Sequence, residues 1–99
     1  MRYLILAADY LDFSLRDVAN AELDRGELPR ELHDALTIWN LDYQPIVRLS
    51  AGERASGAAL EQIAELDRRG LELARSLARG LPRVREVRYY SEGKLEYID

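Results

Sequence analysis

The segment RYLILAA at residues 2–8 constrains the fold more than any other part of the 99-residue chain. Both of its alternating sets of side chains are apolar: Tyr3, Ile5 and Ala7 form one set, and Leu4, Leu6 and Ala8 form the other. A strand that is apolar on both sides usually lies in the interior of its sheet. We therefore expect this strand at the centre of its sheet. The length of the chain predicts a single domain over residues 1–99.

The run YLILAA is also too short to span a membrane, and it lacks the length and cleavage pattern of a signal peptide. We therefore expect a cytoplasmic protein without a membrane partner. The chain contains no cysteine, which excludes disulfides, thiolate catalysis and cysteine metal sites.

Residues 29–46 show the pattern of an amphipathic helix. Pro29 suits the first helical position. Apolar side chains then recur at steps of three and four, at Leu32, Ala35, Leu36, Trp39, Tyr43 and Ile46. Pro45 has no N–H to donate to the carbonyl of Leu41, so we expect the helix to end or kink near that point.

A second and clearer helix is predicted after the small-residue segment SAGERASGAA at 50–59. Either Ser50 with Glu53, or Ser56 alone, can cap it. Its apolar stripe is Ala59, Ile63, Leu66, Gly70, Leu73 or Ala74, and Leu77. The glycine within this stripe predicts the close approach of another backbone, and Gly80 predicts a left-handed residue at the helix end.

Residues 14–25 allow two interpretations. Ser14 followed by Asp17 can cap a short helix, and apolar residues then fall at helical spacing, at Leu15, Val18, Ala19 and Leu23. The alternative is an ordered loop.

The C-terminal stretch VREVRYYSEGKLEYID predicts a β-hairpin. A two-residue turn would mix charged and apolar side chains on each face. A three-residue loop at 91–93, with Gly93 in the left-handed conformation, instead aligns one core face: Val87, Tyr89, Leu95 and Tyr97. We therefore expect Tyr90 to pair with Lys94 and to remain exposed.

Together these segments predict an α+β fold. We expect a three-stranded sheet with a helical hairpin on one face, in the order β–(loop or short α)–α–α–β–β. The other face of the sheet would then be partly exposed or covered by a second copy of the chain, with Tyr3 or Leu4 on it.

The net charge of −4 is unevenly distributed. Residues 9–42 contain nine acidic residues and three arginines, a net charge of −6. Such a region repels nucleic acid and attracts a basic protein, so we expect no nucleic-acid partner. The alternative is that these acids only solvate a loop and one helix face.

No strong catalytic motif is present, so we expect no catalytic residue, cofactor or metal. His33 is the only histidine, and a solvent-facing helix position is favoured over a metal ligand or general base. The segment 52–57 has the length of a phosphate loop but lacks its Lys and Ser/Thr. A minor alternative is that Asp9, Asp12 and Asp17, which follow the first strand, bind Mg²⁺.

Four stretches of the chain, LILAADY, LPRELHDALTIWN, LDRRGLELARSLARGLP and VRYYSEGKL, resemble a type of short uncharacterised protein from high-GC actinobacteria. The matching positions are Ala8-Asp9-Tyr10, Trp39 and Gly70 to Ala74, while Arg16 replaces a tryptophan that is frequent there. The resemblance implies no known activity. In size and charge alone, the chain is also similar to immunity proteins and antitoxins.

These features leave three hypotheses about function. The first is a non-enzymatic protein that binds and inhibits a partner, such as a basic toxin, through the acidic region 9–42. The second is a self-associating homodimer with a structural or regulatory role. The third is a small enzyme or ion-binding protein that uses His33 or the three aspartates. The residues expected to contact a partner are Asp9, Asp12, Asp17, Glu22, Asp24, Tyr90 and Lys94.

Overall fold

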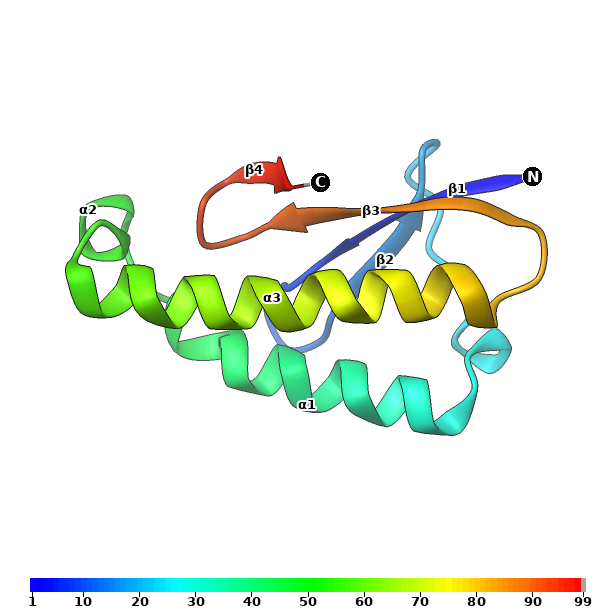
Figure 1. The fold of residues 1–99 in the computed structure, drawn as a ribbon, viewed down its shortest axis with the longest axis horizontal. Coiled ribbons are helices and arrows are strands. Elements are labelled where there is room, and N and C mark those ends of the chain that lie inside the picture. The colour runs from blue at the N-terminus through cyan, green and yellow to red at the C-terminus, as the bar shows by residue number, and fades with distance from the viewer. Residues whose placement is uncertain (99) are drawn as a thin grey trace.

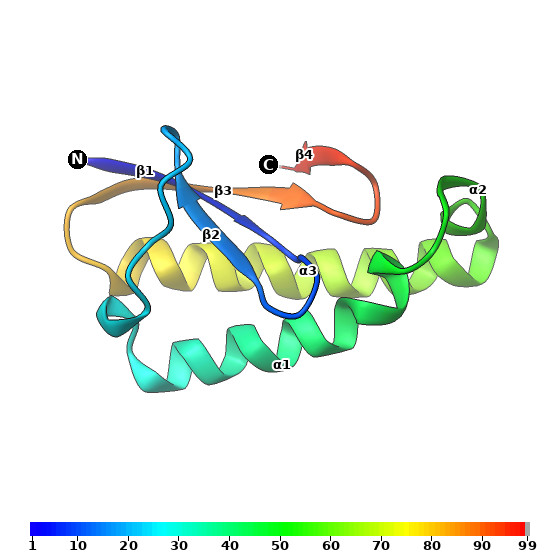
Figure 2. The ribbon, with the colours of Figure 1, turned by 180° about the vertical axis from the view of Figure 1, so that it is seen from behind.

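A computed structural model describes residues 1–98 as an α+β fold, which confirms the predicted fold class. Figures 1 and 2 show the chain from front and back. Its elements are β1 (Arg2–Ala7), β2 (Ser14–Asp17), a 3-10 turn (Arg25–Glu27), α1 (Arg30–Val47), α2 (Ala51–Arg54), α3 (Gly57–Gly80), β3 (Val84–Ser91) and β4 (Glu96–Ile98).

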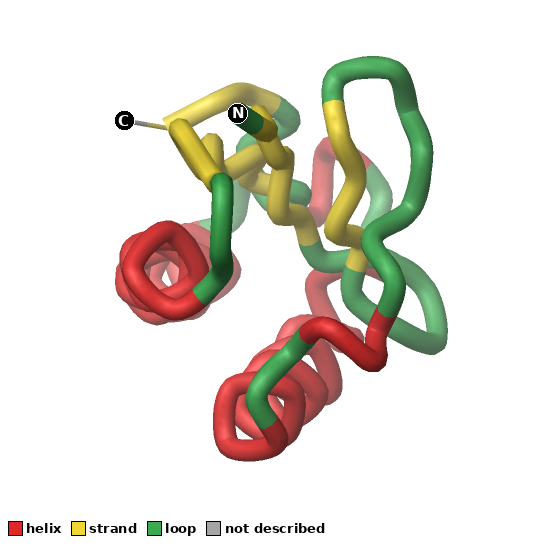
Figure 3. The backbone as a smooth tube through the Cα atoms, turned by 90° about the vertical axis from the view of Figure 1, so that its right-hand side faces the viewer, coloured by secondary structure: helices red, strands yellow, loops and turns green. Residues whose placement is uncertain are grey.

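The sheet contains four strands in the order β2-β1-β3-β4. β1 pairs in parallel with β3 and antiparallel with β2, so it lies in the interior of the sheet as predicted. β4 pairs antiparallel with the end of β3. Figure 3 shows both long helices on one side of the strands. No element among residues 1–98 covers the other side.

The prediction of three strands is wrong because residues 14–17 form a fourth strand, rather than a helix or a loop. Leu15 is buried and pairs with β1. After this strand, the Asp17 carboxylate accepts hydrogen bonds from the backbone N–H groups of Ala19 and Ala21 and so stabilises a turn. The element order therefore begins β–β, and pairing with β1 overrides the helical spacing of the apolar residues.

Both predicted helices are present and pack their apolar stripes on the sheet. Ser56 caps α3, as one of the two alternatives predicted. Ser50 and Glu53 also form a capping box, but it begins the short helix α2. α1 runs past Pro45 and ends at Val47.

Two glycines of α3 differ from their predicted roles. Gly80 is not left-handed: α3 continues to it, and the next residue, Leu81, is extended with φ −102° and ψ 140°. Gly70 permits the predicted close approach, but by a side chain rather than by a backbone. A Cβ atom at Gly70 would lie 2.4 Å from Cε1 of Tyr89.

The register predicted for the C-terminal hairpin is wrong. Tyr90 pairs with Tyr97, not with Lys94, so the connection is longer than three residues. Tyr97 consequently lies on the uncovered face with 46% of its surface exposed, and Ile98 pairs with the buried Tyr89 instead.

The physical reason for this difference lies in the loop. The residue with a left-handed backbone is Leu95, with φ 57°, and Gly93 has a negative φ. Gly93 is required for space, because a Cβ atom there would lie 2.7 Å from two atoms of Ile63. A pairing of Arg85 with Asp99, which the predicted register allows, lies outside the described residues.

The core lies between the helices and the covered face of the sheet. Trp39 and Tyr43 of α1 and Tyr89 of β3 are its largest buried side chains, with the Trp39 ring centroid 5.6 Å from Tyr43 and 5.9 Å from Tyr89. In residues 1–98 no helix has both the length and the apolar character needed to cross a membrane.

Candidate functional site

The uncovered face of the sheet carries apolar side chains where polar ones are expected. A strand that faces water normally presents polar residues on its outward side. On β1 the outward residues are Tyr3, Ile5 and Ala7, and Tyr3 is 45% exposed. Because β1 is an interior strand, apolar surface is exposed in the middle of this face, as on many protein-binding surfaces.

Strand pairing arranges the outward side chains in three rows across the sheet. One row is Ser14, Ala7, Tyr90 and Tyr97, the next is Arg16, Ile5 and Arg88, and the third is Tyr3 and Glu86. We call the surface formed by these three rows, together with Val18, the open face.

Two tyrosines and one arginine form a contiguous cluster on the open face. The rings of Tyr90 and Tyr97 meet edge to face, with centroids 5.1 Å apart. The guanidinium carbon of Arg88 lies 4.2 Å from the centroid of the Tyr97 ring. Such a cation–π contact orients the arginine without neutralising it. No carboxylate among residues 1–98 forms an ion pair with Arg88, so its charge is available to a ligand.

A shallow hollow of about 310 Å³ lies beside this cluster. Its residues are Ile5, Ala7, Ser14, Arg16, Asp17, Val18, Asn20, Tyr90 and Tyr97. The hollow exists because Ala7, on the interior strand, is small, whereas Tyr90 beside it is large. It therefore offers an apolar floor, an aromatic wall and, at Arg16, a hydrogen-bond donor.

The five acidic residues predicted to contact a partner mostly engage their own loops. Asp9 and Asp12 each accept a hydrogen bond from the next backbone N–H, and Asp24 accepts one from the N–H two residues on. Arg25 forms ion pairs with Asp12 at 3.3 Å and with Glu22 at 3.6 Å. These contacts explain the residues as parts of the loop, and whether they bind a partner stays a prediction.

The residues considered for metal or acid–base chemistry are not brought together. Within residues 1–98 no group of three or more His, Asp or Glu side chains could hold a metal ion. His33 is half-buried, packs edge to face against Phe13 at 5.8 Å, and lies 3.6 Å from the Asp34 carboxylate. Its contacts are those of a packed surface residue.

Of the two predicted contact residues in the hairpin, only Tyr90 lies on the open face. Lys94 is exposed in the β3–β4 loop, where its backbone N–H donates to Ser91 Oγ at 3.0 Å. The prediction missed Tyr97 because the assumed register placed it in the core, and it missed Arg88 because the same register set Arg88 opposite Glu96. The available signal was the alternation of VREVRYY, which puts Arg88 and Tyr90 on one side of the strand.

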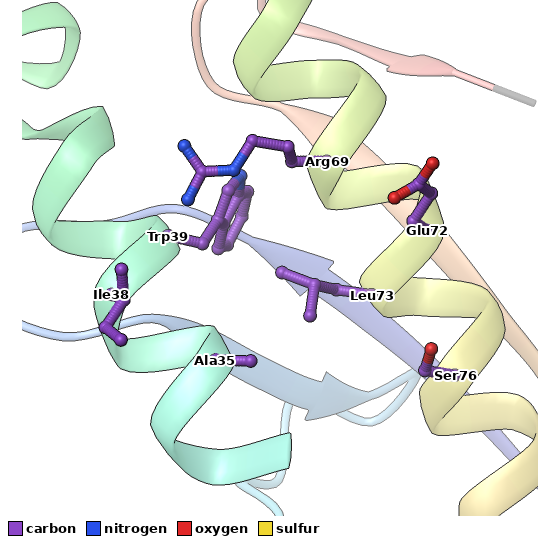
Figure 4. Close-up of a pocket in the computed structure, with 7 residues that line it drawn as sticks. All are labelled: Ala35, Ile38, Trp39, Arg69, Glu72, Leu73 and Ser76. Atoms are coloured by element: carbon purple, nitrogen blue, oxygen red, sulfur yellow. The ribbon is translucent and has the colours of Figure 1, made fainter. Parts of the chain in front are cut away.

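A second depression, of about 360 Å³, lies between the two long helices (Figure 4). It is lined by Ala35, Ile38, Trp39, Arg69, Glu72, Leu73 and Ser76. Its charged groups already have partners: Arg69 pairs with Asp42 at 2.9 Å, and Glu72 with Arg68 at 2.9 Å. We interpret this depression as part of the helix packing.

A buried carboxylate supports the hairpin from below. Asp67 of α3 is only 3% exposed. Its Oδ1 accepts hydrogen bonds from the hydroxyls of Tyr43 at 2.9 Å and Tyr89 at 2.6 Å, and its Oδ2 accepts one from Ser91 Oγ at 2.7 Å. Three donors to one carboxylate compensate for much of the cost of burying it.

Two of these hydroxyls extend the network to the β3–β4 loop. The backbone N–H of Gly93 donates to the Tyr43 hydroxyl oxygen at 2.8 Å, and the backbone N–H of Lys94 donates to Ser91 Oγ at 3.0 Å. Asp67 therefore holds the loop that precedes β4, and with it Tyr97 on the open face. This network was not predicted from the sequence, although Asp67 lies within the apolar stripe, four residues after Ile63.

The two buried tyrosines, Tyr43 and Tyr89, should make the free energy of unfolding fall at alkaline pH. Burial is the main cause that raises the pKa of Tyr43 to about 12 from the ordinary 10.0, and burial likewise raises the pKa of Tyr89. The unfolded chain releases these protons near pH 10, whereas the folded chain retains them. Their stabilising contribution is therefore complete below pH 10 and falls as the pH rises through 12.

Denaturant unfolding at several pH values measures this effect. The free energy of unfolding should decline above pH 10, and Tyr43→Phe should reduce the steepness of the decline. Tyr3→Phe, which removes an exposed hydroxyl, controls for the substitution itself. Equal slopes for wild type and Tyr43→Phe would show that Tyr43 does not titrate as described.

Comparison of the chain with protein-family models, with curated proteins and with solved structures found no match.

Proposed function

We propose that this chain is a non-enzymatic protein-binding domain that uses the open face of its sheet. The observation that carries the proposal is the cluster of Arg88, Tyr90 and Tyr97 beside an apolar hollow. Tyrosine and arginine are enriched among the residues that supply most of the binding energy at protein interfaces. Their arrangement on a rigid sheet also reduces the entropy lost on binding.

The charge of the chain favours a protein over a nucleic acid as the partner. Surfaces that bind single strands combine exposed aromatic rings with a positively charged groove. The open face supplies two arginines and one glutamate, Glu86, in a chain whose net charge is −4. The long-range field of the protein therefore opposes the approach of a phosphate backbone.

A homodimer through the same face is the second candidate. The apolar residues at the centre of the face, Tyr3, Ile5 and Ala7, fit a second copy as well as they fit another protein. The narrower hypothesis of an inhibitor that attracts a basic toxin requires the acidic region 9–42 to contribute. Among the acidic residues of that region, Asp17 lines the hollow.

Affinity capture with matched variants tests the proposed function. The full chain is immobilised and exposed to nuclease-treated extract of its native host cells. A captured protein should be retained by wild type and lost with Arg88→Ala/Tyr97→Ala. The control, Arg68→Ala/Leu41→Ala, removes one exposed arginine and one exposed large apolar side chain from the helices and should retain the captured protein.

Circular dichroism of each variant confirms that it is folded before the comparison is made. Equal capture by the wild type and the open-face variant would overturn the proposal, as would retention only of material that nuclease removes. A mass that doubles with concentration in wild type, but not in the open-face variant, would favour the homodimer.

A further inference from the structure

The outer edge of β3 is only partly paired. β4 pairs with Tyr89 to Ser91 and, within residues 1–98, no strand lies beside Val84 to Arg88 on that side. Figure 1 shows β4 over one end of β3 only. The opposite edge of the sheet differs, because loop residues bond to β2: Leu23 N–H donates to the Leu15 carbonyl at 2.9 Å.

A hollow of about 250 Å³ lies next to this free edge, between β3 and α3. Its apolar surface comes from Leu71 and Ala74 of α3, Val87 of β3 and Ile98 of β4. A strand added beside β3 would direct alternate side chains toward the helix layer, where this hollow lies. The edge thus offers both unpaired backbone groups and a pocket for a side chain.

The charged groups around the edge are mainly positive. Arg75 of α3 and Arg85 and Arg88 of β3 are exposed, against a single exposed carboxylate, Glu86. None of the four has an ion-pair partner among residues 1–98. The local charge therefore complements an acidic segment, although the whole chain is acidic.

We propose that the edge of β3 from Val84 to Arg88 binds an extended acidic segment of a partner protein as an added β-strand. Backbone hydrogen bonds supply affinity in this mode, and side-chain pockets supply specificity. An apolar side chain of the segment fills the hollow on the helix side, and its acidic side chains lie in the positive field of Arg75, Arg85 and Arg88. The inference rests on the proposed protein-binding function but uses the strand edge, which shares Glu86 and Arg88 with the open face.

A second copy of the chain fits this edge less well. Antiparallel pairing of two copies over the same five residues places Glu86 opposite Glu86 of the other copy, and like charges directly opposite one another destabilise a sheet. Val87 would then face Arg85, so the hollow would gain no apolar partner.

Amide NMR of the full-length chain tests the proposal with a defined probe, the capped hexapeptide Asp-Val-Asp-Val-Asp-Val. The peptide should shift the amide signals of Val84 to Arg88 and slow hydrogen exchange at alternate positions among them. Two control peptides should lose this effect: one N-methylated at alternate residues, and one with lysine in place of aspartate. Arg75→Glu/Arg85→Glu should weaken binding roughly tenfold, and Arg68→Glu/Arg79→Glu should not.

Three results would overturn the proposal. Absence of any shift in the edge at millimolar peptide would exclude it. Shifts confined to Tyr90 and Tyr97 would place the peptide on the open face, which would support protein binding but not this edge. Shifts in the edge that depend on protein concentration without peptide would identify a second copy as the occupant.

Discussion

Replacing Asp67 by alanine is expected to lower the free energy of unfolding by about 3–5 kcal/mol. The change removes the acceptor of three buried hydroxyl groups, those of Tyr43, Tyr89 and Ser91. Each unsatisfied buried group costs about 1–3 kcal/mol. The total free energy of unfolding of a domain of this size is about 5–15 kcal/mol. Urea unfolding of Asp67→Ala should therefore detect a much less stable or unfolded chain.

Two further variants make this prediction specific. Asp67→Asn keeps one oxygen acceptor for the tyrosines. It should therefore lower the free energy of unfolding by less than Asp67→Ala does, about 1–2 kcal/mol. Glu61→Ala changes an exposed carboxylate on the same helix and should stay within about 0.5 kcal/mol of wild type. If Asp67→Ala were as stable as Glu61→Ala, the network would not hold the hairpin.

Replacing Gly70 by alanine is expected to destabilise the fold by about 1–3 kcal/mol, although alanine is the better helix former. The new Cβ would lie 2.4 Å from Cε1 of Tyr89. That ring cannot easily move, because its hydroxyl donates to Asp67 at 2.6 Å and the ring packs against Trp39. Thermal and urea unfolding of wild type and Gly70→Ala measure the difference in stability.

Two comparisons separate this contact from helix propensity. In a Tyr89→Val background the ring is absent, so Gly70→Ala should become stabilising by up to about 1 kcal/mol. Gly80→Ala, in the same helix, meets only Leu32 Cδ2 at 3.9 Å and should be neutral or stabilising. A loss of stability from Gly70→Ala that is unchanged in the Tyr89→Val background would contradict this explanation.

The helical layer could be predicted from local features of the sequence. Ser56 caps α3, and the stripe from Ala59 to Leu77 is buried as its spacing indicates. Pro29 precedes α1, whose buried face includes Leu36, Trp39, Tyr43 and Ile46. Such features are local, so tertiary structure does not have to be known to read them.

The sheet was less predictable because pairing between distant segments determines it. The interior position of β1 followed from its apolar composition on both sides. The strand β2 could not be predicted in this way, because Leu15, Val18, Ala19 and Leu23 also fit a helix. Only pairing with β1 decides between a strand and a helix there. A four-residue strand carries too few alternations to be recognised by pattern alone.

The prediction of the candidate site was wrong because of one assumption about Gly93. Glycine in a hairpin loop usually indicates a left-handed backbone. Here Leu95 takes that conformation, and Gly93 is needed for contact with Ile63, thirty positions away in the sequence. The resulting register moves Tyr97 to the open face beside Tyr90, and a two-tyrosine cluster replaces a single exposed ring.

Titration calorimetry with the captured partner tests the proposal that the open face binds a protein. We predict that Arg88→Ala/Tyr97→Ala binds at least about thirty-fold more weakly than wild type, because the loss of interface hot spots costs 2 kcal/mol or more. Arg68→Ala/Leu41→Ala should bind as wild type does. Equal dissociation constants for all three proteins would contradict the claim and place the binding surface elsewhere on the chain.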